Sequence, residues 1–278
     1  MISVQNRIFA PLENEEMNLE FYKYQGTGND FVMIDNRDLK VSKNNTKLIK
    51  QLCDRRFGIG GDGLILLEEP DAAEDDFKMV YFNADGNPSS MCGNGGRCLV
   101  AFANYLGIVE KTARFTAIDG PHKATISEGI VSLKMQNVTD LKLQEEYSFL
   151  DTGSPHHVVF VEDVQSEDVR QKGSEIRYSE MYKDNNGTNV NFVQQINDGV
   201  LKVRTYERGV EDETFSCGTG VTAVAIAAYQ TGKIQNKEVK LETPGGSLEV
   251  KFEKTGSGFE NIWLTGPAVQ VFKGEIVC

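Results

Sequence analysis

The chain has 278 residues, 40% of them hydrophobic, with a formal net charge of −12 and a pI near 4.8. This length fits two domains of ordinary size, and the hydrophobic content is sufficient for real cores. A strongly negative protein repels phosphate backbones and anionic membrane surfaces, so we expect no nucleic-acid partner and no membrane partner.

The sequence also indicates the cellular compartment. No apolar run approaches the roughly 20 residues of a membrane span, and the first residues lack the apolar stretch of a secretion signal. Five cysteines, an odd number, argue against a disulfide framework. We therefore expect a cytoplasmic protein with reduced thiols. Residues 1–16 precede a second methionine, Met17, and we expect them to form a poorly ordered extension.

Strands predominate among the predicted elements, with a few helices between them. In chain order, the pattern predicts a strand at 31–36, a helix at 46–56, strands at 63–69 and 77–83, a helix at 93–106, a strand at 157–163, a helix at 166–180, a strand at 190–196 and a helix at 218–231. Turn signals at 197–199 and 244–246 predict hairpins.

One element occurs twice: Met91-Cys92-Gly93-Asn94-Gly95 and Ser216-Cys217-Gly218-Thr219-Gly220. The cysteines are 217 − 92 = 125 residues apart, and the same shift carries Tyr81 onto Tyr206. The repeat predicts an α/β (α+β) fold of two pseudo-symmetric halves, with a cleft between them. Each half is expected to wrap a strongly curved, mostly antiparallel sheet around a central apolar helix.

The repeat also suggests boundaries. We expect an N-terminal half at 17–136 carrying Cys92 and a C-terminal half at 137–264 carrying Cys217. The remaining residues, 265–278, are expected to form a terminal strand, and its return to the N-terminal half is left open.

Cysteines at the start of glycine-rich helices suit proton transfer at carbon. A helix N-terminus stabilises a thiolate, and its free N–H groups bind a carboxylate. Two such helices facing each other would hold an amino acid with Cys92 and Cys217 on opposite faces of its α-carbon. One thiolate would remove the proton and the other thiol would supply one, which inverts the centre. A single Cys-Gly-x-Gly is weak evidence, whereas its duplication at matched positions favours catalysis.

Several motifs together resemble the diaminopimelate epimerases, a family of pyridoxal-phosphate-independent amino-acid epimerases. Besides the two cysteine motifs, they are Gly28-Asn29-Asp30-Phe31, Phe82-Asn83-Ala84-Asp85-Gly86, Pro155-His156 and Glu207-Arg208-Gly209. The resemblance covers nearly everything after Met17. It implies conversion of LL-2,6-diaminopimelate to the meso form, without metal or organic cofactor, in lysine and peptidoglycan-precursor synthesis.

The resemblance also implies roles for individual residues. Cys92 and Cys217 would be the acid–base pair, with His156 and Glu207 tuning their pKa values. The substrate-binding residues that it implies are Asn29, Asn83, Gly93, Asn94, Asn189, Glu207, Arg208, Gly218 and Thr219. Of these, the backbone of the cysteine motifs would bind the reacting carboxylate and Asn29 would lie near the amino group, while Asn83, Asn189 and Arg208 would hold the distal end.

The chain departs from the family pattern at three places. Ser154 stands where many members have asparagine, and Gly63 where several have glutamine, so both are candidate site positions with altered contacts. The segment from Glu207 to Cys217 also has one residue more than the family pattern.

Other readings of the sequence stay open. A proline or hydroxyproline racemase would use the same two thiols, and an isomerase of the phenazine-biosynthesis type would share the fold without the cysteine pair. A redox or ligand-binding protein would join Cys92 and Cys217 reversibly. The glycines at 58–63 fit G-x-G-x-x-G but follow a helix and precede a strand, the reverse of a dinucleotide site. We expect no metal, and the sequence leaves a homodimer open.

Overall fold

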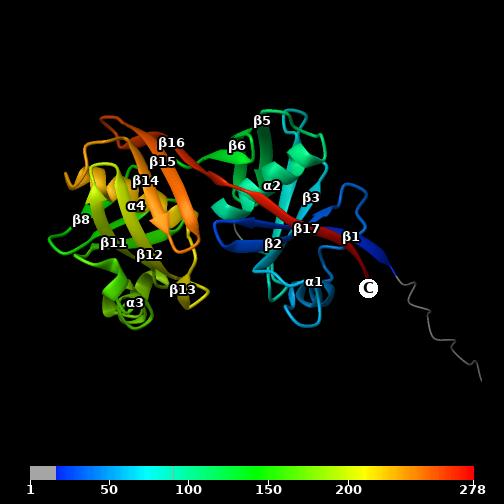
Figure 1. The fold of residues 1–278 in the computed structure, drawn as a ribbon, viewed down its shortest axis with the longest axis horizontal. Helices are drawn as coiled ribbons and strands as arrows, with labels where there is room; N and C mark the ends of the chain where they lie inside the picture. The colour runs from blue at the N-terminus through cyan, green and yellow to red at the C-terminus, as the bar shows by residue number, and fades with distance from the viewer. Residues whose placement is uncertain (1–16, 90) are drawn as a thin grey trace, which may run out of the picture.

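Two halves lie side by side in the computed structural model, which describes residues 17–89 and 91–278 (Figure 1). The prediction for residues 1–16 lies outside the described residues.

The first half contains two helices and seven strands. They are β1 (Asn18–Gly26), β2 (Asn29–Asp35), α1 (Thr46–Cys53), β3 (Gly63–Glu68), β4 (Phe77–Asn83), α2 (Gly93–Tyr105), β5 (Thr112–Ala117), β6 (Gly120–Ser127) and β7 (Ile130–Lys134). Strand β2 pairs in parallel with β3, and β4 in parallel with β5, while β3–β4, β5–β6 and β6–β7 are antiparallel.

The second half repeats this arrangement. Its elements are β8 (Leu141–Leu143), β9 (Ser148–Asp151), β10 (Pro155–Phe160), η1 (Val164–Ser166), α3 (Val169–Arg177), η2 (Glu180–Asn185), β11 (Asn189–Asn197), β12 (Val200–Glu207), β13 (Asp212–Thr214), α4 (Gly218–Gln230), β14 (Glu238–Thr243), β15 (Gly246–Lys254) and β16 (Phe259–Pro267). The parallel pairs are now β10–β11 and β12–β14.

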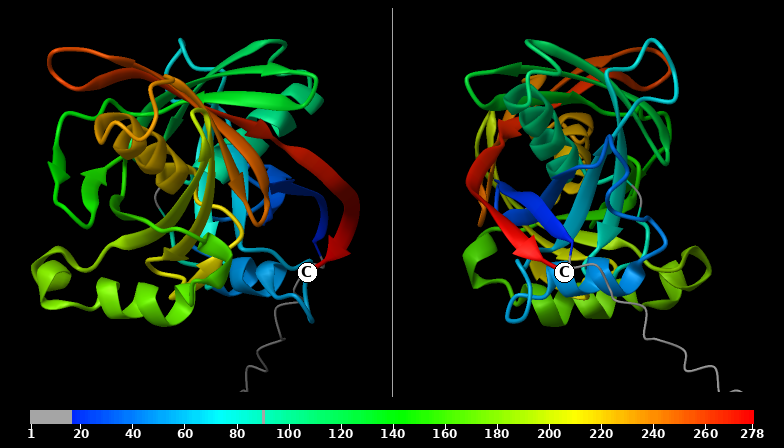
Figure 2. Two further views of the ribbon diagram at one scale, coloured as in Figure 1. Left: turned by 60° about the vertical axis from the view of Figure 1, so that its left-hand side comes forward. Right: turned by 90° about the vertical axis from the view of Figure 1, so that its right-hand side faces the viewer.

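Helices α2 and α4 are the counterparts at the centres of the two halves. Both of their ends differ by 125 residues, 218 − 93 and 230 − 105. Each is buried along almost its whole length, because its side chains are apolar or small on nearly every face. The views in Figure 2 show strands curving around these helices. The predicted fold class is therefore confirmed.

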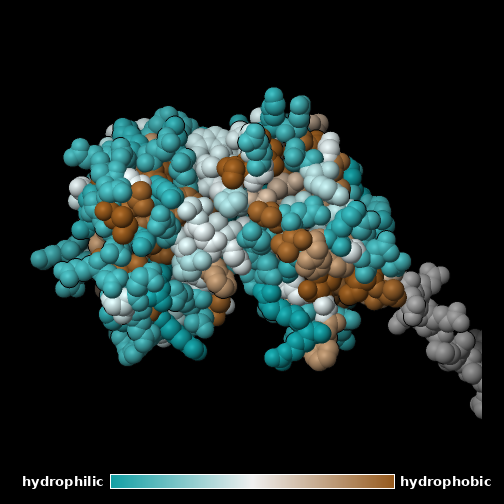
Figure 3. All heavy atoms as spheres, viewed as in Figure 1, coloured by the Kyte–Doolittle hydropathy of each residue, from teal (hydrophilic) through white to brown (hydrophobic). Residues whose placement is uncertain are grey.

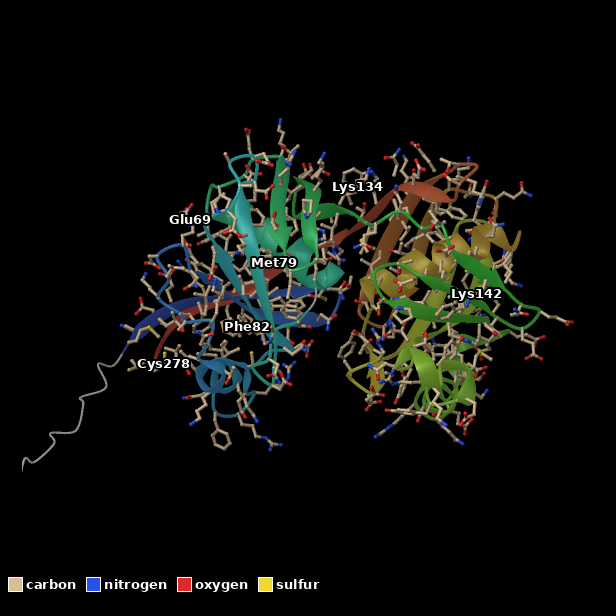
Figure 4. All side chains as sticks on the ribbon, turned by 180° about the vertical axis from the view of Figure 1, so that it is seen from behind. Glu69, Met79, Phe82, Lys134, Lys142 and Cys278 are labelled. Atoms are coloured by element: carbon tan, nitrogen blue, oxygen red, sulfur yellow. The ribbon has the colours of Figure 1, made fainter. Side chains whose placement is uncertain are left out.

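Two strand pairings join the halves. Strand β7 pairs with β16, where Lys134 lies opposite Trp263. The last strand, β17 (Val269–Val277), crosses to the first half and pairs antiparallel with β1 (Figure 1). In Figure 4, Cys278 and Phe82 accordingly lie in one half and Lys142 in the other. The boundaries expected at residues 136 and 264 stay a prediction.

Two predicted helices are shorter in the structure. Helix α1 ends at Cys53 rather than at residue 56, because the Asp54 backbone is extended and its side chain accepts hydrogen bonds from the N–H groups of Arg56 and Phe57. The helix predicted at 166–180 is α3 flanked by two short 3₁₀ turns. Asp168 caps α3 by accepting from the Gln171 N–H.

Candidate active site

The two cysteines occupy equivalent positions at the starts of α2 and α4. Cys92 and Cys217 are the N-cap residues, and both have extended backbones. Neither side chain makes a capping hydrogen bond, so it leaves the N–H groups of the first turn available to an anion.

The N-termini of the two helices touch through glycine. A methyl group added at Gly218 would lie 3.4 Å from Gly93 Cα and 2.8 Å from Leu264 Cδ2. Gly93 has the matching contacts, 3.6 Å to Gly218 Cα and 3.2 Å to the same leucine. The two backbones therefore approach each other closely at these glycines, and the Leu264 side chain fills the space beside both.

Burial controls the ionisation of both thiols. Desolvation raises the pKa of Cys92, while the backbone N–H groups of Gly95 and Asn94 lower it. For Cys217, desolvation also raises the pKa, against smaller lowering by Thr219 and the Gly220 N–H. The helix N-terminus acts in the expected direction, but the net lowering expected from the sequence is wrong because burial outweighs it.

A buried histidine is connected to Cys217 through Thr219. His156 Nε2 is 2.9 Å from Thr219 Oγ1, which is 3.4 Å from Cys217 Sγ. Because the Asn191 amide donates to His156 Nδ1, the neutral ring carries its proton on Nε2 and donates it to Thr219. Burial lowers the pKa of His156 to about 3, with a further contribution from Arg208. The Thr219 hydroxyl proton is then free to point at the sulfur.

Glu207 lies at the end of β12, near both thiols. Burial raises its pKa, outweighing the opposite effect of Thr214. The charge of Glu207 in turn raises the pKa of Cys92 and of Cys217. A carboxyl group that is costly to ionise and lies near two thiols is suited to sharing protons with them.

Polar side chains connect the halves beside the helix N-termini. Asn94 Nδ2 donates to Asn29 Oδ1 at 2.6 Å and to Ser216 Oγ at 3.0 Å. Asn29 donates to Asp62, and Ser216 Oγ lies 2.7 Å from Thr27 Oγ1. Asn94 Oδ1 is buried and has no hydrogen-bond partner in the described part of the chain. A donor on a bound molecule would satisfy that oxygen.

Ser154, Asn189 and Arg208 form a third group. Asn189 donates to Ser154 Oγ at 2.9 Å and accepts from the Arg208 backbone N–H at 2.8 Å. Arg208 Nη2 lies 3.5 Å from the same serine. In the other half, Gly63 pairs with Asn83 across β3 and β4, and the Asn83 side chain is exposed. The structure thus brings Ser154 to the predicted group.

The segment after Arg208 is held by one carboxylate. Glu211 has a left-handed backbone and pairs with Arg177 of α3 at 2.6 Å. It also accepts from Tyr178 and from the Gly209 N–H. Although burial opposes it, the contact with Arg177 lowers the pKa of Glu211 to about 2. This contact ties the segment that follows Arg208 to α3.

The amino-acid sequence is similar to those of known proteins. A family model for diaminopimelate epimerase matches residues 21–138 and 148–271. A diaminopimelate epimerase of Flavobacterium psychrophilum is 56% identical over 259 residues, which cover 93% of this chain and all of the relative. The chain belongs to the diaminopimelate epimerase family. A second relative of the same name, from Aquifex aeolicus, is 41% identical over 93% of this chain and 98% of its own length.

Solved structures share the fold of this diaminopimelate epimerase family member at low identity. A phenazine biosynthesis protein of the PhzF family from Bacillus anthracis superposes with a TM-score of 0.75, 13% identity, and coverage of 94% of this chain and 100% of its own. For a probable proline racemase from Agrobacterium radiobacter, the TM-score is 0.68 and the sequence identity 16%, with coverage of 93% of this chain and 92% of its own. At such identities the likeness shows the fold alone.

Sequence reasoning missed several polar residues of the site. Asn191, which orients His156, lies two residues after Asn189 on the same face of β11. This strand spacing could have marked Asn191 as a further site residue. Thr27 and Ser216 flank predicted residues but meet across 189 positions of sequence. Of the other three cysteines, Cys53 and Cys98 are buried in apolar clusters, and Cys278 packs against the cluster that contains Cys53.

Within the described residues, no helix is long and apolar enough to cross a membrane. Nor do three or more His, Cys, Asp or Glu side chains gather into a metal-binding group within 17–89 and 91–278.

Proposed function

We propose that this protein epimerises LL-2,6-diaminopimelate to the meso isomer without a cofactor, as an isomerase of lysine and peptidoglycan-precursor biosynthesis. One observation carries the proposal: two cysteines are the N-caps of two equivalent helices whose first residues touch. The family assignment supplies the substrate.

Binding begins with the α-carboxylate at the reacting carbon. The free N–H groups at the starts of α2 and α4 attract this anion and fix its position. The unpartnered Asn94 Oδ1 accepts a hydrogen bond from the substrate's α-ammonium group. Asn29, which receives the Asn94 amide, holds that oxygen in place.

Proton transfer then uses both thiols. One cysteine, as thiolate, takes the α-proton, and the electron pair delocalises into the carboxylate at the helix N-termini. The opposite cysteine, as thiol, delivers its proton to the other face and becomes the thiolate. The direction of the reaction decides which of Cys92 and Cys217 takes which part. Glu207, His156 and Thr219 adjust the proton affinities of the pair.

The distal end of the substrate distinguishes this reaction from proline racemisation. Arg208, Asn189, Ser154 and Asn83 would bind the second carboxylate and amino group, which proline lacks. Support comes from the grouping of the first three by hydrogen bonds. Ser154, which is shorter than the asparagine of many relatives, would act by holding Asn189 and Arg208 in place through its hydroxyl group.

Incubation of purified, reduced protein with LL-diaminopimelate, L-proline or trans-4-hydroxy-L-proline tests the proposal. Chiral chromatography should detect meso-diaminopimelate and no inverted proline. Cys92→Ala and Cys217→Ala should each abolish turnover, with circular dichroism confirming the fold. If the protein inverts proline and not diaminopimelate, it is a proline racemase and the proposed substrate is wrong. Full activity in either variant would reject the two-thiol mechanism.

We also propose a cytoplasmic location and a homodimer. Five cysteines without a disulfide support a reducing compartment. Strand β17 supports the dimer, since Val269, Val271, Phe272 and Val277 are each at least 45% exposed on it. Figure 3 shows hydrophobic atoms over the end of the molecule that contains β1 and β17. Sedimentation should give a dimer for the wild type and a monomer for Phe272→Lys; a wild-type monomer would reject the dimer.

A further inference from the structure

Arg97 is a fully buried cation at the junction of the two halves. It lies on α2 and its side chain is 0% exposed. Its guanidinium packs against glycine on two strands: a methyl group at Gly26 would lie 3.4 Å from Nη2, and one at Gly266 would lie 3.2 Å from Nε. Larger side chains at either position would occupy the space that the guanidinium fills.

The contacts of this guanidinium are all neutral. Nη1 lies 3.5 Å from the Gly93 carbonyl oxygen and Nη2 donates to Thr27 Oγ1 at 3.1 Å. Nε has no hydrogen-bond partner, and no carboxylate pairs with Arg97, within residues 17–89 and 91–278. A buried charge without a counter-ion is strongly destabilising, so it calls for an anion close by.

Cys98 is not that anion. It neighbours Arg97 on α2, but burial raises its pKa to about 12, so it stays a neutral thiol near pH 7. The remaining ionisable group that interacts with Arg97 is Cys92, which precedes the Gly93 carbonyl that the guanidinium approaches.

Arg97 is also connected to the second cysteine. Thr27 Oγ1, its hydrogen-bond partner, lies 2.7 Å from Ser216 Oγ, and Ser216 directly precedes Cys217. Asn94 donates to the same serine oxygen. The guanidinium thus lies beside residues that adjoin both cysteine N-caps.

We propose that Arg97 is a positioning residue whose positive charge stabilises the anions formed at the two helix N-termini, the Cys92 thiolate and the bound carboxylate. The part concerning the carboxylate rests on the proposed function; the part concerning the thiolate does not. The charge acts on these anions by Coulomb attraction, without contacting the substrate.

Other groups around Cys92 act with or against this charge. Glu207 raises its pKa, as does burial, while Arg97 and the N–H groups of Gly95 and Asn94 lower it. Cys98, Cys217 and Tyr81 are further ionisable groups that interact with the Cys92 sulfur. Because Glu207 is negative when ionised, Arg97 is the cation that offsets it.

The test measures the thiolate directly. Iodoacetamide is applied to intact protein across a pH series, and peptide mass spectrometry follows alkylation of Cys92 alone. Arg97→Met and Arg97→Gln remove the charge and should raise the midpoint of the Cys92 profile by about one pH unit. Arg97→Lys retains the charge and should leave the midpoint within about 0.3 units. Thr27→Val should do the same, because it removes the hydrogen bonds of this hydroxyl to Arg97 and Ser216 but leaves the charge.

An unchanged midpoint in a folded neutral variant would overturn the proposal. If both neutral variants fail to fold, Arg97→Lys decides, because a midpoint raised by a full unit despite its charge would also overturn it. Epimerisation of LL-diaminopimelate by the same proteins is measured separately. A shifted alkylation profile in the neutral variants, together with no epimerase activity in the wild type, would uphold the role of Arg97 and reject the proposed function.

Discussion

Thr219 is the hydroxyl that connects His156 to Cys217, so Thr219→Val tests this connection with little change in shape. The threonine oxygen is 2.9 Å from His156 Nε2 and 3.4 Å from Cys217 Sγ. Valine replaces that oxygen with a methyl group. The thiolate of Cys217 then loses its donor, and the His156 N–H loses its acceptor.

The expected effect follows from the strength of a hydrogen bond to a charged group. Such a bond contributes about 1.5–3 kcal/mol, which corresponds to a rise of about 1–2 units in the pKa of Cys217. We expect kcat/KM to fall about 10–100-fold. Stability should fall by about 1–3 kcal/mol because the buried His156 N–H is left without a partner.

The assay combines epimerisation kinetics with the pH dependence of Cys217 alkylation. Thr219→Ser restores the hydroxyl and should restore both. Thr222→Val is a matched control on the same helix, since the Thr222 hydroxyl donates to the Gly218 carbonyl oxygen and does not contact either site residue. If Thr219→Val folds and its Cys217 profile matches that of the wild type, the proposed connection is refuted.

Three further predictions follow from other contacts. Gly218→Ala places a methyl group 2.8 Å from Leu264 Cδ2, so it should displace this leucine beside the helix N-termini and lower kcat/KM severalfold and stability by about 1 kcal/mol. Gly256→Ala, which meets nothing within 4 Å, should change neither, and equal effects would contradict the packing argument. Because His156 has a folded pKa of about 3 and an ordinary value of 6.5, the stability that its neutral form contributes is complete above pH 6.5 and is lost as the pH falls. Urea unfolding should therefore show a loss of about 3 kcal/mol between pH 7 and pH 4 that is absent in His156→Gln. Equal losses in the two proteins would refute the assignment. Glu211→Gln should loosen the segment after Arg208 and raise KM for diaminopimelate more than it lowers kcat. Glu213→Gln, which breaks only the pair with Arg204, should leave both constants unchanged. Unchanged kinetics in Glu211→Gln would show that the contact with Arg177 does not position Arg208.

Periodicity and the repeat were sufficient to predict the two central helices and their cysteine N-caps. Apolar side chains all around α2 and α4 require burial, and a cysteine directly before each helix stands at its N-cap. The local pattern also located the hairpin between β11 and β12.

The direction of the thiol pKa shifts was beyond the sequence, because it depends on a balance. Helix N-termini lower the pKa of a cysteine, but the depth of burial, which only the packed halves determine, raises it more. Contacts such as Thr27 with Ser216 escaped prediction for a related reason. They join segments 189 residues apart, and no local pattern states which residues of two halves will meet. The same holds for Arg97, whose burial depends on both strands that contain its glycine neighbours.

The central claim is that two thiols act on opposite faces of one carbon. The most direct measurement incubates reduced protein with LL-diaminopimelate in D2O and follows α-deuterium and meso product together at early times. The account predicts deuterated meso product with little deuterium in the recovered LL substrate, because the base that removes the proton is not the acid that returns one. Rapid exchange into recovered LL substrate without inversion would show a single base and contradict the account.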